Sequence, residues 1–470
     1  LTGTIGAEGG ISGVDASTRI EHLTVAERHD LGAKVIFVRF FGAPGVEAPV
    51  SAFDRNNALS VFLMGMLPAV GGSVISFMLG AFFVWGMLSL ASKHLSFRMT
   101  HTDRVLAWTF TVFPVLVFAT GLLGENRPEL FRSIIWLLPF LSLWVVIPRL
   151  RASPNLDYLQ LYILGAAAGS IGALVVASLQ IFLFGIRPQG GAGNAAVFAN
   201  MCLCLAGIAG LAIDAPRQAH RLLAGIAAVT GLIAVVFSLT RGVILAALPV
   251  AVLLFAYAPR RWRAIALHPV SLVVFAGAAL VLYGVWGTVG PRIDWTFREM
   301  KEVLAGGYTM SVGERVRLWG AAWSAFLESP LWGYGIQNRM QALVPFLSQD
   351  GRAIYSFTHP HNGFLAFAID GGLIVLAALL ALLAMPVAVA WRAPRDGAYR
   401  RRLFLALVLV TAYAAIGMTQ IMFKHDIMDA FFIFTTIIVA ASIPDPKGEK
   451  NGDAGKNGDE TSPIEASEAT

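Results

Sequence analysis

Charged side chains and cysteine are both scarce in this chain of 470 residues. Asp, Glu, Lys and Arg make up 14% of it, against roughly 25% in soluble globular domains. Together with a mean hydropathy of +0.68, this scarcity excludes a soluble enzyme. The two cysteines, Cys202 and Cys204, lie in one apolar run, so neither a disulfide framework nor a cysteine-rich metal site is expected.

Long apolar runs fill most of the sequence. Hydrophobic residues make up 56% of the chain, in continuous stretches rich in Leu, Ala and Val. A stretch of about 20 such residues spans a bilayer as a helix, whereas the strands of an outer-membrane barrel alternate between apolar and polar residues. The expected fold class is therefore all-α, a polytopic helical membrane protein.

About twelve membrane spans are expected. Residues 58–91 would form one helix of about 51 Å, too long for one crossing, and Pro68, Gly71 and Gly72 favour two paired spans. The remaining spans are expected at 105–123, 133–148, 159–184, 195–213, 222–238, 242–258, 264–286, 362–390, 403–422 and 427–443. The expected divisions are a tail at 1–57, nine spans within 58–286, one large loop at 287–360, three spans within 361–443 and a tail at 444–470.

Lys and Arg in the short loops predict the orientation. One set of loops carries fifteen of them and the opposite set carries five, and the richer side of a membrane protein is usually cytoplasmic. Both termini are therefore expected in the cytoplasm and the 287–360 loop in the periplasm. The net charge of +6 reflects these loops, so no nucleic-acid partner is expected.

Neither tail is assigned any chemistry. Residues 1–57 lack the charged start, apolar core and cleavage site of a signal peptide, so a cytoplasmic tail is expected. Residues 444–470 are rich in Gly, Pro and Glu, which predicts disorder.

Four arginines are expected on the outer side, where the positive-inside tendency does not explain them. Arg241 begins a span directly after Ser238 and Thr240, and Arg187 lies in a Gly-rich turn. Arg315 and Arg317 open an expected amphipathic helix in the large loop. A guanidinium can fork onto two phosphate oxygens, although snorkelling to lipid headgroups would explain Arg241 as well.

The apolar face of the loop helix is expected to lie on the membrane. It contains Leu318, Ala322 and Phe326. Ser329 and Pro330 should end this helix, and the Gly-Tyr-Gly sequence after them should turn the chain.

A histidine and two acidic or amide side chains stand near the tenth span. His361 and Asn362 stand at its start, and a neutral His can accept a proton from a hydroxyl; a structural His is the alternative. Asp370 lies within the span, where carboxylates are rare and often functional. His359 and His361 lack a third ligand of suitable spacing for zinc, and the turn Lys424-His425-Asp426 is a lesser candidate for the same site.

These residues resemble the motifs of the bacterial O-antigen ligase and O-antigen polymerase superfamily of membrane glycosyltransferases. Arg241 to Leu245 matches an R-x3-L motif, and His361, Asn362 and Gly371 match most of a second, whose last position departs from the family at Val375. The stretch from Arg315 to Trp319 also resembles the family's loop. The resemblance extends over residues 58–443.

The resemblance implies glycan transfer from undecaprenyl pyrophosphate to an acceptor hydroxyl at the periplasmic face of the bacterial inner membrane, without a metal or other cofactor. It implies that Arg241 and Arg317, with Arg187 and Arg315, bind the pyrophosphate, and that His361 activates the acceptor. Asn362 and Asp370 are further candidates for substrate binding.

Three functions remain compatible with the sequence. A ligase would transfer the polymer to lipid A-core, a polymerase would extend a growing glycan still on the lipid, and a transporter or flippase would bind the same lipid without chemistry. We favour the ligase. The transporter is disfavoured because the polar groups lie at one face, whereas transporter sites lie at the midplane.

Overall fold

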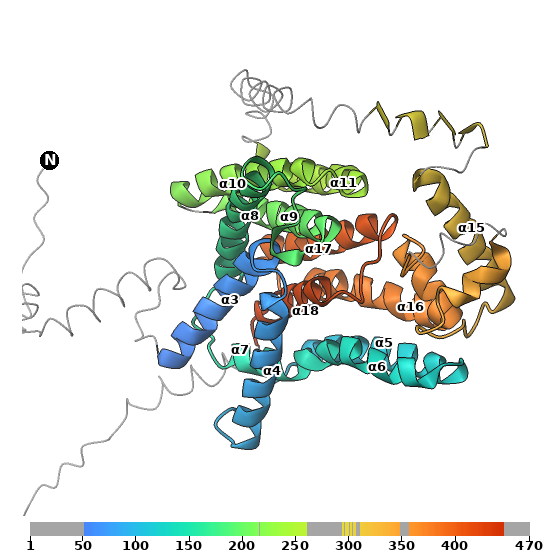
Figure 1. Ribbon diagram of the computed structural model, residues 1–470. Helices are drawn as coiled ribbons and strands as arrows, with labels where there is room; N and C mark the ends of the chain where they lie inside the picture. Colours follow the sequence, from blue (N-terminus) through green and yellow to red (C-terminus); the bar gives the residue numbers. More distant parts are fainter. Residues whose placement is uncertain are drawn as a thin grey trace, which may run out of the picture.

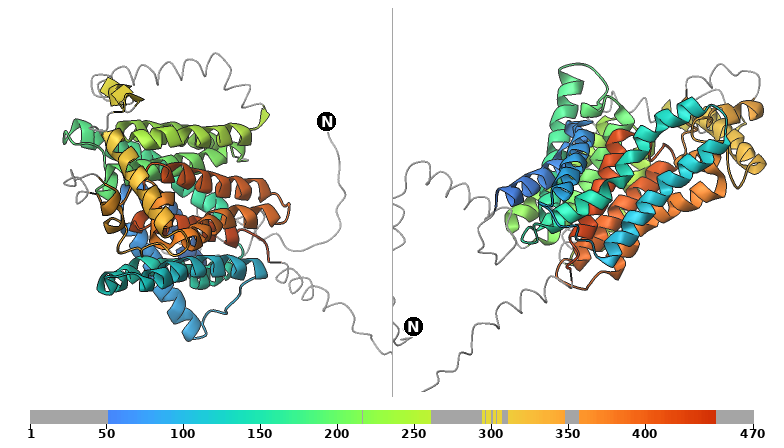
Figure 2. Two further views of the ribbon diagram at one scale, coloured as in Figure 1. Left: turned by 90° about the vertical axis from the view of Figure 1, so that its right-hand side faces the viewer. Right: turned by 90° about the horizontal axis from the view of Figure 1, so that it is seen from below.

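The computed structural model describes residues 51–215, 217–260, 311–347 and 357–445, with a few positions between 294 and 306. Across these residues the fold consists of helices and loops, and no strand occurs among them. The helices form an elongated bundle with most axes running in one general direction (Figures 1 and 2). The all-α expectation is confirmed for the described part of the chain.

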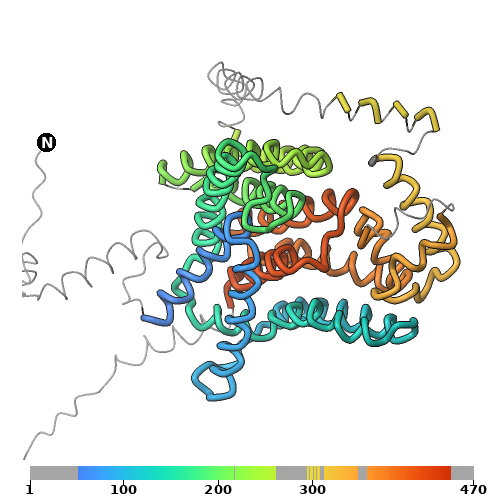
Figure 3. The backbone as a smooth tube through the Cα atoms, in the orientation of Figure 1, coloured from blue at the N-terminus to red at the C-terminus, as the bar shows by residue number. Residues whose placement is uncertain are grey.

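The first half of the bundle contains helices α3 to α11, whose course can be followed along the tube in Figure 3. Their bounds, with three short 3-10 turns, are α3 Ala52–Val70, α4 Val74–Ala91, α5 His101–Leu123, α6 Arg127–Leu137, η1 Leu138–Ser142, α7 Leu143–Arg151, α8 Tyr158–Phe182, η2 Gly190–Ala192, α9 Ala195–Gly210, η3 Leu211–Asp214, α10 Gln218–Phe237 and α11 Arg241–Tyr257.

The second half contains a loop helix and three long helices. Their bounds, with one 3-10 turn, are α15 Ser311–Glu328, η4 Gln341–Phe346, α16 Gly363–Arg392, α17 Tyr399–Gly417 and α18 Asp426–Ala441. Seven helical segments of the described residues are long and apolar enough to cross a membrane: Val74–Ala91, His101–Leu123, Arg127–Arg151, Tyr158–Phe182, Ala195–Asp214, Gln218–Phe237 and Gly363–Arg392. The expected span at 264–286 lies outside the described residues.

The first apolar run divides where its Pro and Gly residues predict. α3 ends at Val70 and α4 begins at Val74. Gly72 lies between them with φ of +57°, a conformation that glycine adopts at little cost. α3 itself begins at Ala52, before the expected boundary at residue 58, because Ser51 and Asp54 form a capping box at its start.

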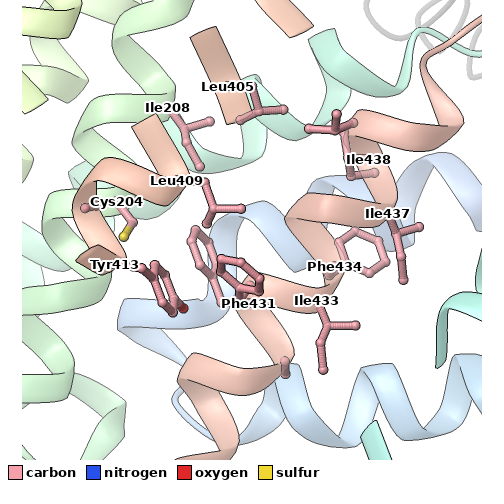
Figure 4. Packing of buried hydrophobic residues seen from close by; sticks show 14 of the residues in the cluster. Cys204, Ile208, Leu405, Leu409, Tyr413, Phe431, Ile433, Phe434, Ile437 and Ile438 are labelled. Carbon is pink, nitrogen blue, oxygen red and sulfur yellow. The ribbon is translucent and has the colours of Figure 1, made fainter. Parts of the chain in front are cut away.

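The centre of the bundle is apolar and closely packed. Side chains from α9, α17 and α18 meet there, among them Cys204, Tyr413 and Phe431 (Figure 4). Cys202 and Cys204 are both buried and unbonded, so they contribute to the core. This packed centre fixes the ends of the same helices, where the polar residues gather.

Candidate functional site

Arg187 and the turn before α11 form one unit. Nε of Arg187 donates to the carbonyl oxygen of Ser238 at 2.7 Å, and its Nη2 donates to Oγ1 of Thr240 at 3.1 Å. Leu239 between these residues has φ of +54°, an uncommon conformation for a non-glycine residue. Arg187 therefore stabilises the turn that places Arg241 at the first position of α11.

Arg241 pairs with Glu299, and Arg315 lies close enough for both of their charges to act on it. Nη1 of Arg241 donates to Glu299 at 2.5 Å, and the indole of Trp295 donates to the other oxygen of Glu299 at 2.6 Å. The carboxylate is buried and the guanidinium of Arg241 is one-third exposed. The pKa of Arg315 is lowered by burial and by Arg241, and raised by Glu299. Two arginines and one carboxylate among the described residues thus act on one another here.

Arg317 has a buried donor without a partner. Its Nε has no hydrogen-bond partner among the described residues. A buried unsatisfied donor is costly, and in native structures such groups often serve a ligand or ion. Among the predicted arginines, Arg317 therefore has unused capacity to bind one.

His359 and His361 meet at Gln420. Their ring centroids lie 4.6 Å apart, and Nε2 of His359 and Nδ1 of His361 each lie 3.3 Å from Oε1 of Gln420. Because this oxygen accepts, both of those nitrogens carry the proton. Nδ1 of His359 then accepts from the hydroxyl of Thr358 at 3.0 Å, so both of its nitrogens are used inside the protein.

His361 keeps one nitrogen free for a substrate. With the proton on Nδ1, its Nε2 carries the lone pair, and no hydrogen bond to this atom occurs among the described residues. Burial, followed by the charge of Arg315, lowers the pKa of His361, which the Gln420 bond partly offsets. The ring is therefore neutral at pH 7 and suited to accept a proton.

Asn362 has a structural role beside this histidine. Its side chain accepts from the backbone N–H groups of Phe364 and Leu365, and so caps α16. His361 has φ of +54°, and the indole of Trp319 donates to its carbonyl oxygen at 3.3 Å. The cap and the loop helix together fix the position of the His361 ring.

Helix α16 is broken at Gly371 and Gly372, where the loop attaches. Gly372 has φ of +61°, and a Cβ there would meet the backbone of Leu331. Tyr334 N–H donates to the carbonyl of Ile369 at 2.8 Å. Nine residues separate Asn362 from Gly372, so Gly372, one position after the Gly371 matched from the sequence, is the glycine that the close approach requires.

Two further backbone bonds complete this attachment. The N–H of Gly335 donates to the carbonyl of Asp370 at 2.8 Å, and the N–H of Leu373 donates to the carbonyl of Pro330 at 2.7 Å. The break in α16 leaves the carbonyl of Asp370 and the N–H of Leu373 without partners in the helix, and the loop provides their hydrogen-bond partners. The loop therefore holds its position through hydrogen bonds to α16.

The apolar face of α15 does not lie on the membrane, and that expectation is wrong. Leu318, Ala322 and Phe326 are buried, and the first two belong to a small core with Leu343 and Ile369. The reason is that α15 packs against both η4 and α16. The loop helix is thus part of the protein core at this end.

Asp370 forms a bidentate pair with Arg339, a residue that the sequence did not identify. Nε of Arg339 donates to Oδ1 at 2.8 Å, and its Nη2 donates to Oδ2. Both side chains are almost fully buried, and the guanidinium also lies over the ring of Phe367. Both carboxylate oxygens of Asp370 are thus bonded to the protein.

The turn Lys424-His425-Asp426 borders a cavity of about 370 Å³. The lining residues are Trp136, Asn194, Ala196, Val197, Asn200, Arg339, Thr358, His359, Gln420, Ile421, Lys424, His425 and Met428. Burial lowers the pKa of Lys424 to about 8, and Arg339 adds to this effect. The turn that the sequence offered as a weaker candidate therefore lies beside His359. Within the described ranges, no group of three or more His, Cys, Asp or Glu side chains is arranged to hold a metal ion.

The fold and the clustering of polar groups at one end of the bundle define a helical membrane protein with a site formed by helix ends and a loop. Residues 226–380 match the family model described as O-antigen ligase. This match confirms, for the matched segment, the resemblance to the O-antigen ligase and polymerase superfamily found in the sequence. No curated protein matches the chain.

The matched segment contains most of the predicted site. Arg241, Arg315, Arg317 and His361 lie within it, as do Asn362 and Asp370, whereas Arg187 precedes it. Lys424 and Gln420 follow it. The site described here therefore uses helices on both sides of the matched domain.

Proposed function

We propose that the protein transfers a glycan from undecaprenyl pyrophosphate to an acceptor hydroxyl, as an O-antigen ligase acting on lipid A-core. The observation that carries this proposal is the neutral His361, with one free ring nitrogen, close enough to the Arg241, Glu299 and Arg315 group for Arg315 to lower its pKa. A base beside arginine side chains is what attack by a hydroxyl on a glycosyl pyrophosphate requires.

In the proposed reaction, Nε2 of His361 takes the proton of the acceptor hydroxyl. The oxygen forms a bond to the anomeric carbon of the donor sugar as the bond from that carbon to the pyrophosphate oxygen breaks. Arg241, Arg315 and Arg317 stabilise the charge that develops on the leaving pyrophosphate, with Arg187 holding the turn. Because arginines supply this charge, the reaction is proposed to need no metal ion.

The site is proposed to face the periplasm of a bacterial inner membrane, with the substrates reaching it from the bilayer. The excess of Lys and Arg in the opposite loops supports this orientation. A phosphatase fused after Leu347 should be active and one fused after Lys93 inactive; the reverse pattern would contradict the orientation.

The glycans of a deletion strain test the proposed function. Loss of a ligase leaves long polymer on the lipid carrier and none on lipid A-core. Loss of a polymerase leaves single repeat units, instead of long polymer, attached to lipid A-core. Loss of a flippase blocks the formation of both the long polymer and the glycan on lipid A-core. Purified protein that moves glycan from a lipid-linked donor to lipid A-core would support the ligase, and purified protein that only extends lipid-linked glycan would favour the polymerase.

A further inference from the structure

The cavity beside Lys424 is lined by His359 and Gln420, whereas His361 is not among its lining residues. Asn200 and Lys424 line it as well, and the charge of Arg315 acts on both rings, second to burial on His361 and as the weakest contribution on His359. Gln420 contacts both rings. The two histidines thus connect this cavity with the arginine group, and only the arginine group is used in the proposed function to bind the leaving group.

Among the described residues that line the cavity, Lys424 is a cation without an ion-pair partner, although the charges of Asp370 and Glu129 act on it. Arg339 reaches the cavity already paired with Asp370, and burial lowers the pKa of His359 to about 3, so that its ring is neutral. Lys424 has no ion-pair partner among the described residues, and burial disfavours its charge. The cavity therefore offers a single positive charge to a ligand.

A buried amide group in the same cavity is incompletely satisfied. Asn200 is 1% exposed, its Oδ1 has no hydrogen-bond partner, and its Nδ2 reaches only the sulfur of Met428 at 3.6 Å. Leaving a buried amide oxygen unpaired is costly. A ligand that supplies a hydroxyl to this oxygen would remove that cost.

The remaining lining groups have the chemistry of a sugar site. Trp136 is aromatic, while Asn194, Gln420 and Thr358 are polar, with the amide oxygens of Asn194 and Gln420 already bonded within the protein. The volume of about 370 Å³ falls in the range of small-molecule pockets, roughly 300 to 1,000 Å³. An aromatic surface with a few polar groups and one cation suits a sugar ring that carries one anionic substituent.

We infer that this cavity binds an acidic sugar residue of the acceptor, with Lys424 contacting its phosphate or carboxylate and Asn200 accepting from one of its hydroxyl groups. This inference rests on the proposed function, because it assigns the acceptor to this cavity and the donor pyrophosphate to the arginine group. The acceptor chain would then pass from the cavity to His361 across the neighbouring ring of His359.

Transfer kinetics test the role of Lys424. The acceptors are a core oligosaccharide phosphorylated on the sugar next to the receiving residue, and the same compound after phosphatase treatment. Lys424→Gln should raise KM for the phosphorylated acceptor by roughly tenfold, since a charge-assisted hydrogen bond is lost, and leave KM for the other within about twofold. Lys93→Gln, in the loop between α4 and α5, serves as the matched control. Equal changes for both acceptors would overturn the inference.

Chemical labelling of wild-type protein tests binding without any transfer reaction. Lys424 is acetylated with acetic anhydride in nanodiscs, and its modification is measured by mass spectrometry in the presence of glucose 6-phosphate, glucuronate, glucose or inorganic phosphate. Protection by glucose 6-phosphate or glucuronate supports the inference and identifies the anionic group. Protection by inorganic phosphate alone, or by none of the four, overturns it. Because no glycan is transferred, this outcome is independent of whether the proposed function holds.

Discussion

The imidazole rings of His359 and His361 share one hydrogen-bond acceptor, Oε1 of Gln420, at 3.3 Å from each. Gln420 lies 59 residues after His361 in the sequence, at the end of α17. By accepting from both rings, it leaves the lone pair of His361 on Nε2 and directs that of His359 to Thr358. The two histidines therefore differ in what they can offer a substrate.

His361→Ala should abolish glycan transfer while donor binding stays nearly unchanged. The proton acceptor is lost, which typically costs about 10² to 10⁴ in rate, whereas the arginines that bind the pyrophosphate remain. The measurements are single-turnover transfer and binding of the purified lipid-linked donor. His359→Ala is the comparison, and it should reduce the rate less, because its nitrogens bond within the protein. Normal transfer by His361→Ala, or loss of wild-type activity on adding EDTA, would mean that the proposed mechanism is wrong.

The pH dependence of transfer should follow the ionisation of His361. The lowered pKa keeps the ring neutral at pH 7, so activity should rise as pH increases through a value below the usual 6.5 and then level off. Arg315→Gln removes a positive charge that disfavours the imidazolium. The pKa should therefore rise, and the half-maximal point of the remaining activity should move to higher pH. An unmoved acid limb in the variant would show that another group controls it.

Arg241→Lys should lose more activity than its retained charge suggests. One N–H of Arg241 is already bonded to Glu299, and an ammonium that keeps this bond cannot also provide a planar fork to phosphate. We expect kcat/KM to fall roughly tenfold to a hundredfold, the equivalent of one lost charge-assisted bond. The control is Arg132→Lys, because Arg132 pairs with Glu129 at 3.0 Å on an exposed helix face. Similar activity in both variants would show that Arg241 only fixes the helix at the membrane surface and does not take part in the reaction.

Breaking the pair of Arg339 and Asp370 should destabilise the protein strongly. Arg339→Met leaves a buried carboxylate without its partner, a change that costs about 3 to 5 kcal/mol. The double variant Arg339→Met with Asp370→Leu should recover part of this loss, because no charge is left buried alone. Thermal unfolding in detergent measures both. Arg132→Met, which removes an exposed pair, should cost about 0 to 1 kcal/mol, and an equal cost at Arg339 would contradict the prediction.

Sequence patterns predict much of the fold, because helices in a membrane are specified locally by apolar length and by Pro and Gly. The break between α3 and α4 at Gly71 and Gly72 and the start of α9 after Asn194 are examples. The span expected at 133–148 lies within the apolar segment Arg127–Arg151, but that segment consists of two α-helices joined by a 3-10 turn that contains Pro139. Local patterns do not show such a change of helix type.

The site was only partly predictable for a related reason. Arg241 and His361 can be identified from the sequence by position alone, since each lies at the start of a long apolar run. The pairing of Arg339 with Asp370, and the meeting of Gln420 with two histidines, depend on contacts between distant segments. The burial of the apolar face of α15 within the protein was not predictable, because a sequence shows that a face is apolar but does not show what covers it.

The break at Gly371 and Gly372 also divides α16 into two pieces of unequal length. Its 30 residues would extend about 45 Å as one straight helix, whereas a hydrocarbon core is about 30 Å thick. The 20 residues Leu373–Arg392 that follow Gly372 are sufficient by themselves for one crossing. The eight residues Gly363–Asp370 are then left over for the headgroup layer, and Asp370 belongs to this outer piece. In the proposed reaction, Gly372 would thereby set the depth of His361, at the level where a lipid-linked pyrophosphate would leave the hydrocarbon and meet water.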